Sequence, residues 1–247
     1  NFIELSNYAN GKKIKSIGVE QMYTPHQIPW TVRGAIDLLQ QINRDTNRPF
    51  YLTIDLGHQS GQRKFLSPVY GQIKEKLRQW RENGHLNNLW LGTDNALKLF
   101  YKALKTSGQQ EDHLIREILE DARANPRLFA LHEDGDPHYW LENLGCYSPI
   151  VHLQQTDGKS SAHKAFTPEW NEKGIIDARK VLNAMKCSYD KSRDEKILTP
   201  CDEIYLTIEV FSATADMPAD IKHRLELTSR YWREFIPRDG ETLDKLI

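Results

Sequence analysis

Four short apolar segments of the sequence each contain one side chain of a type that binds metal ions. They span residues 16–22, 51–58, 149–155 and 205–211, and the side chains are Glu20, Asp55, His152 and Glu209. If the segments are strands, their side chains alternate between two faces, so the aliphatic neighbours face one way and these four side chains the other. Two Glu, one Asp and one His on a common face form a ligand set for one divalent cation. Manganese, magnesium or cobalt suits such an oxygen-rich set, and zinc also binds these ligand types.

The segment between the first two expected strands has the pattern of a crossover helix. A two-proline loop at 23–30 is followed by Thr31, a helix-capping residue, and by apolar residues at helical spacing up to Ile42. A strand, a helix and a second strand in this order predict a parallel, right-handed crossover. Because functional groups of parallel α/β folds gather at the carboxyl ends of the strands, we expect the four candidate ligands to converge there.

Residues 67–144 interrupt this alternation with a helical pattern and no convincing strand. Helices are predicted at 69–82, 94–105, 111–124 and 137–144, and their charged residues are expected to form a solvated face. Outside this insertion, helices are predicted at 2–9, 176–186 and 217–235. Since no linker or internal repeat divides the chain, we expect one domain over 1–247 that contains the helical insertion.

The composition is that of an ordinary globular protein. The 247 residues are 39% hydrophobic and 27% charged, with a formal net charge of -1, which does not favour a nucleic-acid partner. No apolar stretch approaches the roughly 20 residues of a membrane span, and no secretory signal is visible, so a cytoplasmic location without a membrane partner is expected. Cys146, Cys187 and Cys201 form no Cys-x-x-Cys pair, which indicates neither a disulfide framework nor a thiolate zinc site.

The ordered motifs around the candidate ligands resemble those of the xylose-isomerase-like barrel superfamily, especially its sugar isomerases and ketose 3-epimerases. The motifs are Val-Glu at Glu20, Asp-x-x-His from Asp55 to His58, Val-His-Leu at His152 and Ile-Glu-Val-Phe at Glu209. The resemblance implies an α/β fold of the (β/α)8 TIM-barrel type. In that reading the chain is an N-terminally truncated partial barrel, the C-terminal half with the insertion added, and four strands precede Asn1.

The resemblance also implies a mechanism. A single divalent metal ion, held by the four candidate ligands, would chelate a ketose or related sugar, phosphorylated or not, and acidify a C–H bond so that an enediolate forms. Glu20 and Glu209 would then carry protons as catalytic residues of a sugar isomerase or epimerase. Substrate binding is predicted for His58 on a sugar oxygen, for Trp30 as part of an apolar wall with Tyr23 and Phe211, and for His163 and Lys159 on the sugar chain or a terminal phosphate.

Three alternatives remain open from the residues. The same chemistry serves a sugar-acid lyase, decarboxylase or dehydratase. Apurinic endonucleases share the strand-end motifs but use an Asp-x-His where this sequence has Ser161-Ala162-His163. A non-catalytic sugar-binding barrel would not need two opposed glutamates. The metal identity and the oligomeric state, a homo-oligomer included, stay open as well.

Overall fold

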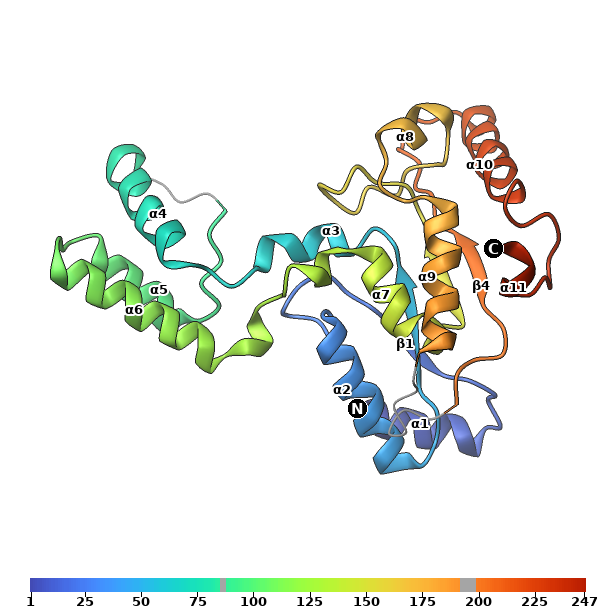
Figure 1. The fold of residues 1–247 in the computed structure, drawn as a ribbon, viewed down its shortest axis with the longest axis horizontal. Helices are drawn as coiled ribbons and strands as arrows, with labels where there is room; N and C mark the ends of the chain where they lie inside the picture. Colours follow the sequence, from blue (N-terminus) through green and yellow to red (C-terminus); the bar gives the residue numbers. More distant parts are fainter. Residues whose placement is uncertain (85–87, 192–198) are drawn as a thin grey trace.

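A four-stranded parallel sheet lies within the larger body of the molecule, on the right in Figure 1. The computed structural model describes residues 1–84, 88–191 and 199–247. The strands are β1 (Gly18–Glu20), β2 (Tyr51–Asp55), β3 (Ile150–Leu153) and β4 (Tyr205–Ile208), and they lie side by side in sequence order with every neighbouring pair parallel. Within the described residues β1 and β4 are therefore the edges of an open sheet, as predicted.

The register of the strands places the four candidate ligands on one face. Asp55 pairs directly with His152, whose partner on β4 is Thr207. Glu209 lies two residues after Thr207, and Glu20 pairs with Thr53, two residues before Asp55. Since side chains two residues apart share a face, all four project to the same side at the carboxyl end of the sheet.

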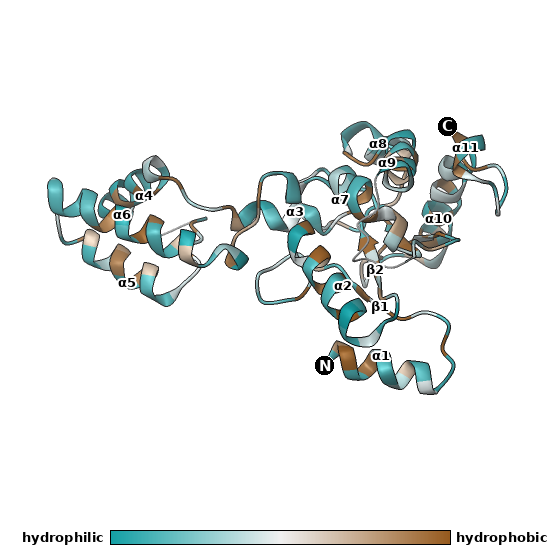
Figure 2. Ribbon diagram, turned by 60° about the horizontal axis from the view of Figure 1, so that its bottom comes forward, coloured by the Kyte–Doolittle hydropathy of each residue, from teal (hydrophilic) through white to brown (hydrophobic). Residues whose placement is uncertain are grey.

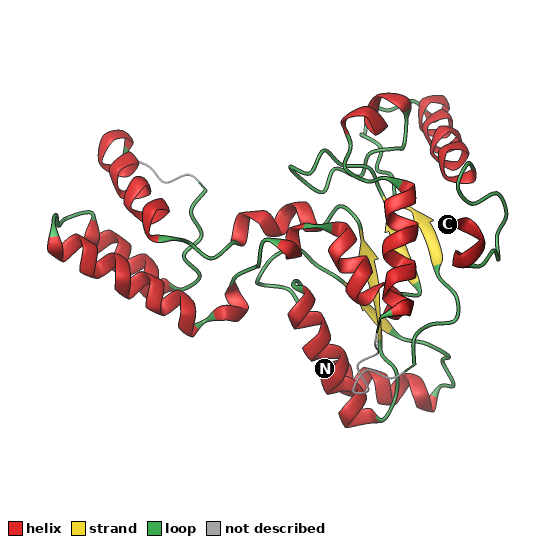
Figure 3. Ribbon diagram, in the orientation of Figure 1, coloured by secondary structure: helices red, strands yellow, loops and turns green. Residues whose placement is uncertain are grey.

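Helices cover the opposite, aliphatic face of the sheet (Figure 3). Ile54 and Val151 are fully buried there and belong to one core with α2 (Val32–Thr46), α7 (Pro137–Leu144) and α9 (Ala178–Asp190). The Thr31 hydroxyl caps α2 by accepting from the backbone of Gly34, as its sequence context predicted. The further helices of this body are α1 (Phe2–Gly11), α3 (Gln59–Gln62), α8 (Pro168–Lys173), α10 (Pro218–Arg233) and α11 (Leu243–Leu246), with 3-10 turns at Arg63–Phe65, Pro126–Leu128, Glu133–Gly135 and Gly145–Tyr147.

The insertion contains an arm of three helices that extends away from the sheet (Figure 1). The arm consists of α4 (Tyr70–Asn83), α5 (Asp94–Ala103) and α6 (Gln109–Ala124), close to the predicted ranges. Its apolar faces, seen as brown stretches in Figure 2, form a second core around Phe100 and Ile115 that is separate from the core under the sheet. The short helices α3, α8 and α11 were not predicted, because four to six residues show too little periodicity.

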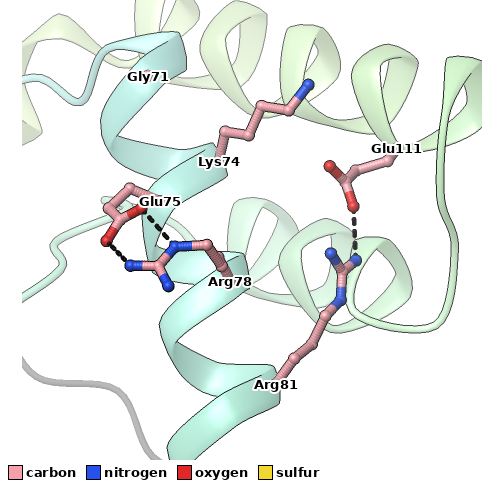
Figure 4. A pocket seen from close by; sticks show the side chains of 6 residues that line it. All are labelled: Gly71, Lys74, Glu75, Arg78, Arg81 and Glu111. Carbon is pink, nitrogen blue, oxygen red and sulfur yellow. Dashed lines mark hydrogen bonds and ion pairs between the residues drawn. The ribbon is translucent and has the colours of Figure 1, made fainter.

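The polar surface of the arm is held by ion pairs. Arg81 on α4 reaches Glu111 on α6 at 2.6 Å, and Arg78 binds Glu75 within α4 at the same distance (Figure 4). Together with Lys74 and Gly71 these side chains line a hollow of about 370 Å³. The arm therefore has the charged, solvated face that the sequence predicted.

The return of the chain from the arm is tied to the loop after β1. The Trp30 indole donates to the carbonyl of Arg127, and the buried Asp134 carboxylate accepts from the backbone of Val32 at 2.8 Å and of Leu131 at 2.7 Å. These bonds join the insertion to the first turn of α2. Among the described residues, no helix combines the length and the apolar character needed to cross a bilayer.

Candidate metal centre

Glu20, Asp55, His152 and Glu209 converge at the carboxyl end of the sheet, and we call them the ligand cluster. Each offers one ligand atom, and these four atoms lie within 4.8 Å of one another. His152 Nδ1 is central: it lies 3.1 Å from Glu209 Oε2, 3.4 Å from Glu20 Oε1 and 3.7 Å from Asp55 Oδ2. Atoms that bind one ion at about 2.0 to 2.6 Å must lie within about 5 Å of each other, so this spacing fits a single cation. The predicted convergence is confirmed, while ligand binding by these residues stays a prediction.

The Asp55 carboxylate is fully buried and held in one orientation. Its Oδ1 accepts from the backbone N–H of Gly57 at 2.7 Å, from that of His58 at 3.2 Å and from the Gln154 amide at 2.7 Å. These three donors occupy one oxygen and leave Oδ2 facing the centre of the cluster. Hydrogen bonds of this kind are typical of the partners that orient metal ligands.

Three atoms of the cluster lack a hydrogen-bond partner although they are buried. They are Asp55 Oδ2, Glu209 Oε2 and His152 Nδ1, and all three point into the same small space. Buried polar atoms without partners are costly, and the like charges of neighbouring carboxylates add to that cost. A divalent cation at their centre would satisfy all three atoms and offset the charge. The residues present therefore fit the metal ion that the sequence predicted.

The electrostatics of the cluster favour bound protons. The contacts with Asp55 and Glu20 raise the pKa of His152 to about 10. Burial, together with the neighbouring Asp55, raises the pKa of Glu209 to about 7. Burial by itself would raise the pKa of Asp55, but the interactions with His152 and His58 hold it well below its ordinary value. The protons on His152 and Glu209 occupy positions that a cation would take, so cation binding must release them.

Two further predicted site residues, His58 and His163, border the ligand cluster. His58 donates from Nδ1 to the carbonyl of Gln21 at 2.7 Å, which leaves Nε2 facing Asp55 Oδ2 at 3.9 Å. His163 places Nδ1 3.7 Å from Glu209 Oε2, and its ring stacks on Phe211 with centroids 3.8 Å apart. Burial lowers the pKa of His163, which favours the neutral ring. The two histidine ring centroids are 6.3 Å apart, with one ring edge-on to the other, at the border of the cluster.

The structure does not bring the other two predicted substrate-binding residues into this group. The Lys159 side chain is 86% exposed, and its ion pair is with Asp157 in its own loop. Trp30 is buried, with its ring edge-on to Phe65 and its indole bonded to Arg127. Trp30 therefore packs between the insertion and the body, and Lys159 extends from the surface. Their predicted contacts with a substrate remain untested.

Sequence reasoning missed the glutamines around the cluster. Gln21 and Gln154 are both fully buried; the Gln21 carbonyl holds His58, and the Gln154 amide holds Asp55. One available signal was Gly57 in Asp-Leu-Gly-His, because a side chain there would collide with the Gln154 amide at 2.3 Å. A second signal was the position of the two glutamines just after strand ends, since an amide that is buried there needs specific hydrogen-bond partners.

Comparisons with known proteins support the fold. No protein-family model matches the sequence, and no curated protein matches it. Among solved structures, the chain is similar to a crystal structure from Rhodospirillum rubrum described as a "Putative Xylose isomerase", with a TM-score of 0.53 and 15% sequence identity. The match covers 94% of this chain and 51% of that one, so the chain spans about half the length of the matched protein. The fold is thus a partial barrel of the xylose-isomerase-like type, as the sequence motifs implied.

Proposed function

We propose that this chain contains the metal centre of a divalent-metal-dependent sugar isomerase or epimerase. The observation that carries the proposal is the convergence of three carboxylates and one imidazole at the carboxyl end of a parallel sheet, with buried atoms that lack partners. Sites of this kind in barrel folds are built from the ends of several strands. The similarity to the Rhodospirillum structure is compatible with this class of reaction but carries the fold alone.

We infer that the two glutamates act as proton carriers. Glu20 ends β1 and Glu209 follows β4, so they come from the two edges of the described sheet, with Asp55 and His152 between them. Their side chains are 39% and 28% exposed, whereas that of Asp55 is inaccessible. Asp55 and His152, in the middle of the sheet, would mainly hold the ion. The two glutamates, at its edges, would also reach a bound molecule from two sides.

Each residue then has a defined task. A divalent cation, when bound, supplies Lewis-acid polarisation of oxygen atoms on neighbouring carbons of the substrate. One glutamate removes the proton from the hydroxyl-bearing carbon next to the carbonyl. The second glutamate delivers a proton to the opposite face of that same carbon, which inverts the centre. Delivery of a proton to the former carbonyl carbon, with a proton moving between the two oxygens, shifts the carbonyl instead.

The borders of the cluster suit a small polyol. Tyr23 lies against His58 with ring centroids 4.9 Å apart, and Phe211 lies against His163 with ring centroids 3.8 Å apart. The Phe211 side is open to solvent, since this residue is 61% exposed. Aromatic faces beside hydrogen-bonding imidazoles are the combination that sugars need, with stacking for C–H groups and polar contacts for hydroxyls. We infer a ketose or a related sugar as the substrate.

The test is C–H exchange in heavy water with a panel of free and phosphorylated ketoses at saturating Mn²⁺. The wild type should incorporate deuterium into one ketose. Glu20→Gln and Glu209→Gln keep an oxygen ligand but remove the basicity, so exchange should fall by about 100-fold or more while Mn²⁺ binding weakens only modestly.

Arg78→Gln, on the distant arm, is the matched control because it also replaces a charged side chain with an amide, and it should keep wild-type exchange. Near-full exchange in both glutamate variants would refute the two-base mechanism. Loss of a carboxylate or of water from a sugar acid, without C–H exchange in ketoses, would favour the lyase alternative.

A further inference from the structure

Gln154, directly after β3, links two parts of the site that are far apart in the sequence. Its side chain is fully buried. Its Nε2 donates to Asp55 Oδ1 at 2.7 Å, and its Oε1 accepts from the backbone N–H of His163 at 2.6 Å. One amide therefore uses its donor on a predicted metal ligand and its acceptor on the loop that carries His163.

The amide has little freedom to move. A methyl group added at Gly57 would lie 2.3 Å from the amide, so the glycine backbone packs directly against it. On the other side Nε2 also lies 3.2 Å from Ser161 Oγ. Only a group with a donor and an acceptor on one rigid plane meets both partners at this site. Neither an alkyl chain nor a carboxylate does so.

Both contacts of the amide fix functional groups. The first helps to saturate Asp55 Oδ1, which leaves Oδ2 to face the ligand cluster. The second holds His163, whose backbone has a positive φ of 45°, in the position where its ring stacks on Phe211 beside Glu209. A residue other than glycine adopts such a φ only when its surroundings hold it there.

We propose that Gln154 is a positioning residue that fixes the Asp55 carboxylate and the His163 loop relative to each other. It touches neither the predicted ion nor the substrate, and it acts through its two partners. This inference rests on the proposed function, because it assigns Gln154 a part in the same metal centre.

Gln155 offers a matched control. It is equally buried and is the next residue, but its amide bonds to the backbone of Ile176 and Thr156 and to the Asn171 side chain. None of these partners belongs to the ligand cluster. Replacing either glutamine with methionine keeps the length and volume of the side chain and removes its hydrogen bonds.

The experiment is a Mn²⁺ titration of the wild type, Gln154→Met and Gln155→Met, with free Mn²⁺ measured by electron paramagnetic resonance. Circular dichroism measures the folded fraction of each protein, so that equal amounts of folded protein are compared. Loss of a partner that orients a metal ligand weakens binding by about 10- to 100-fold. We expect this loss in Gln154→Met and a change of less than about threefold in Gln155→Met. Raising Mn²⁺ to saturation should return the exchange rate of Gln154→Met to within about tenfold of wild type.

Gly57→Ala is a second route to the same question, because its added methyl displaces the amide without removing it. It should weaken Mn²⁺ binding in the wild type, with little further effect in the Gln154→Met background, since the two residues are in contact. Should Gln154→Met fail to fold, Gly57→Ala alone gives the affinity comparison with Gln155→Met.

Equal weakening in the two methionine variants, or unchanged affinity in Gln154→Met, would overturn the positioning role. The positioning role would also be overturned if Gln154→Met, when saturated with Mn²⁺, exchanged the sugar proton more than about 100-fold more slowly than the wild type. A wild type that binds Mn²⁺ but exchanges no sugar proton would refute the proposed function and leave the affinity comparison to decide on Gln154. A wild type that binds no Mn²⁺ would refute both.

Discussion

Acidic residues are used in opposite ways in the arm and at the ligand cluster. In the arm, the exposed Arg78 meets two exposed carboxylates, those of Glu75 and Glu82, each at 2.6 Å. At the carboxyl end of the sheet, three carboxylates share one small space with the His152 imidazole, and no Lys or Arg side chain is paired with them among the described residues. The residue types are the same, but the balance of charge differs.

This difference separates a surface from a site. Exposed ion pairs contribute little to stability and keep a helical surface soluble. Buried carboxylates without enough partners oppose folding, and they persist where something other than stability requires them. The excess of negative charge at the cluster is therefore informative about function, whereas the larger number of charges on the arm is not.

Removing a central ligand is expected to have the largest effect. Asp55→Asn and His152→Ala should abolish Mn²⁺ binding at micromolar concentrations and lower sugar C–H exchange by about 1000-fold or more, because Lewis-acid polarisation contributes several kcal/mol. Mn²⁺ titration and the heavy-water assay measure the two effects. Retention of tight Mn²⁺ binding in both variants would mean that the cluster is not the metal centre.

A cavity in the core of the arm should destabilise the arm and leave the ligand cluster unaffected. Phe100 is fully buried in the second core, so Phe100→Ala should cost about 3 to 5 kcal/mol. Hydrogen exchange should show loss of protection in α4, α5 and α6, while Mn²⁺ affinity stays within about twofold of wild type. A tenfold loss of Mn²⁺ affinity would show that the two regions are energetically coupled.

The pH dependence of metal binding sharpens the difference further. Contacts with Asp55 and Glu20 raise the pKa of His152 to about 10, and burial raises the pKa of Glu209 to about 7. Both groups hold protons below pH 7 that a cation must displace, so Mn²⁺ affinity should rise with pH. Below pH 7, where one or two protons are released, we expect the Mn²⁺ affinity to increase by about 10- to 100-fold per pH unit. Above pH 7 we expect an increase of about 10-fold per pH unit.

Mn²⁺ titrations at pH 5.5, 6.5, 7.5 and 8.5 would measure this dependence. Glu209→Gln removes one of the two titrating groups, so its affinity should change by about 10-fold per unit over the whole range. An affinity that is independent of pH in the wild type would contradict the protonation that we assign to the cluster.

The smallest effect is expected on the arm surface. Arg78 is 57% exposed and its ion pairs with Glu75 and Glu82 lie along one helix. Arg78→Ala should leave the thermal midpoint and the Mn²⁺ affinity of the protein unchanged within error, because solvent screens such pairs. Thermal melts with and without Mn²⁺ test this, and a clear fall in Mn²⁺ affinity would argue against a purely solvated face.

The sequence by itself determined the parts of this protein that depend on local pattern. Alternation along the four strands assigned Glu20, Asp55, His152 and Glu209 to one face. Helical spacing gave the three arm helices to within two residues at each end, and it gave the start of α2, which continues four residues beyond the predicted Ile42. These features follow from the periods of the strand and the helix, which a single segment already contains.

Only the tertiary structure decided which other residues join the ligand cluster. Gln154 reaches Asp55 across 99 positions of sequence, and His163 meets Glu209 because its backbone carbonyl accepts from the N–H of Phe211, after β4. The same folding placed Trp30 in packing contacts and left Lys159 in solvent, although both were predicted to bind substrate, as His163 was. Loop residues have no period that fixes their direction, and their positions depend on hydrogen bonds to distant segments, which no local pattern specifies.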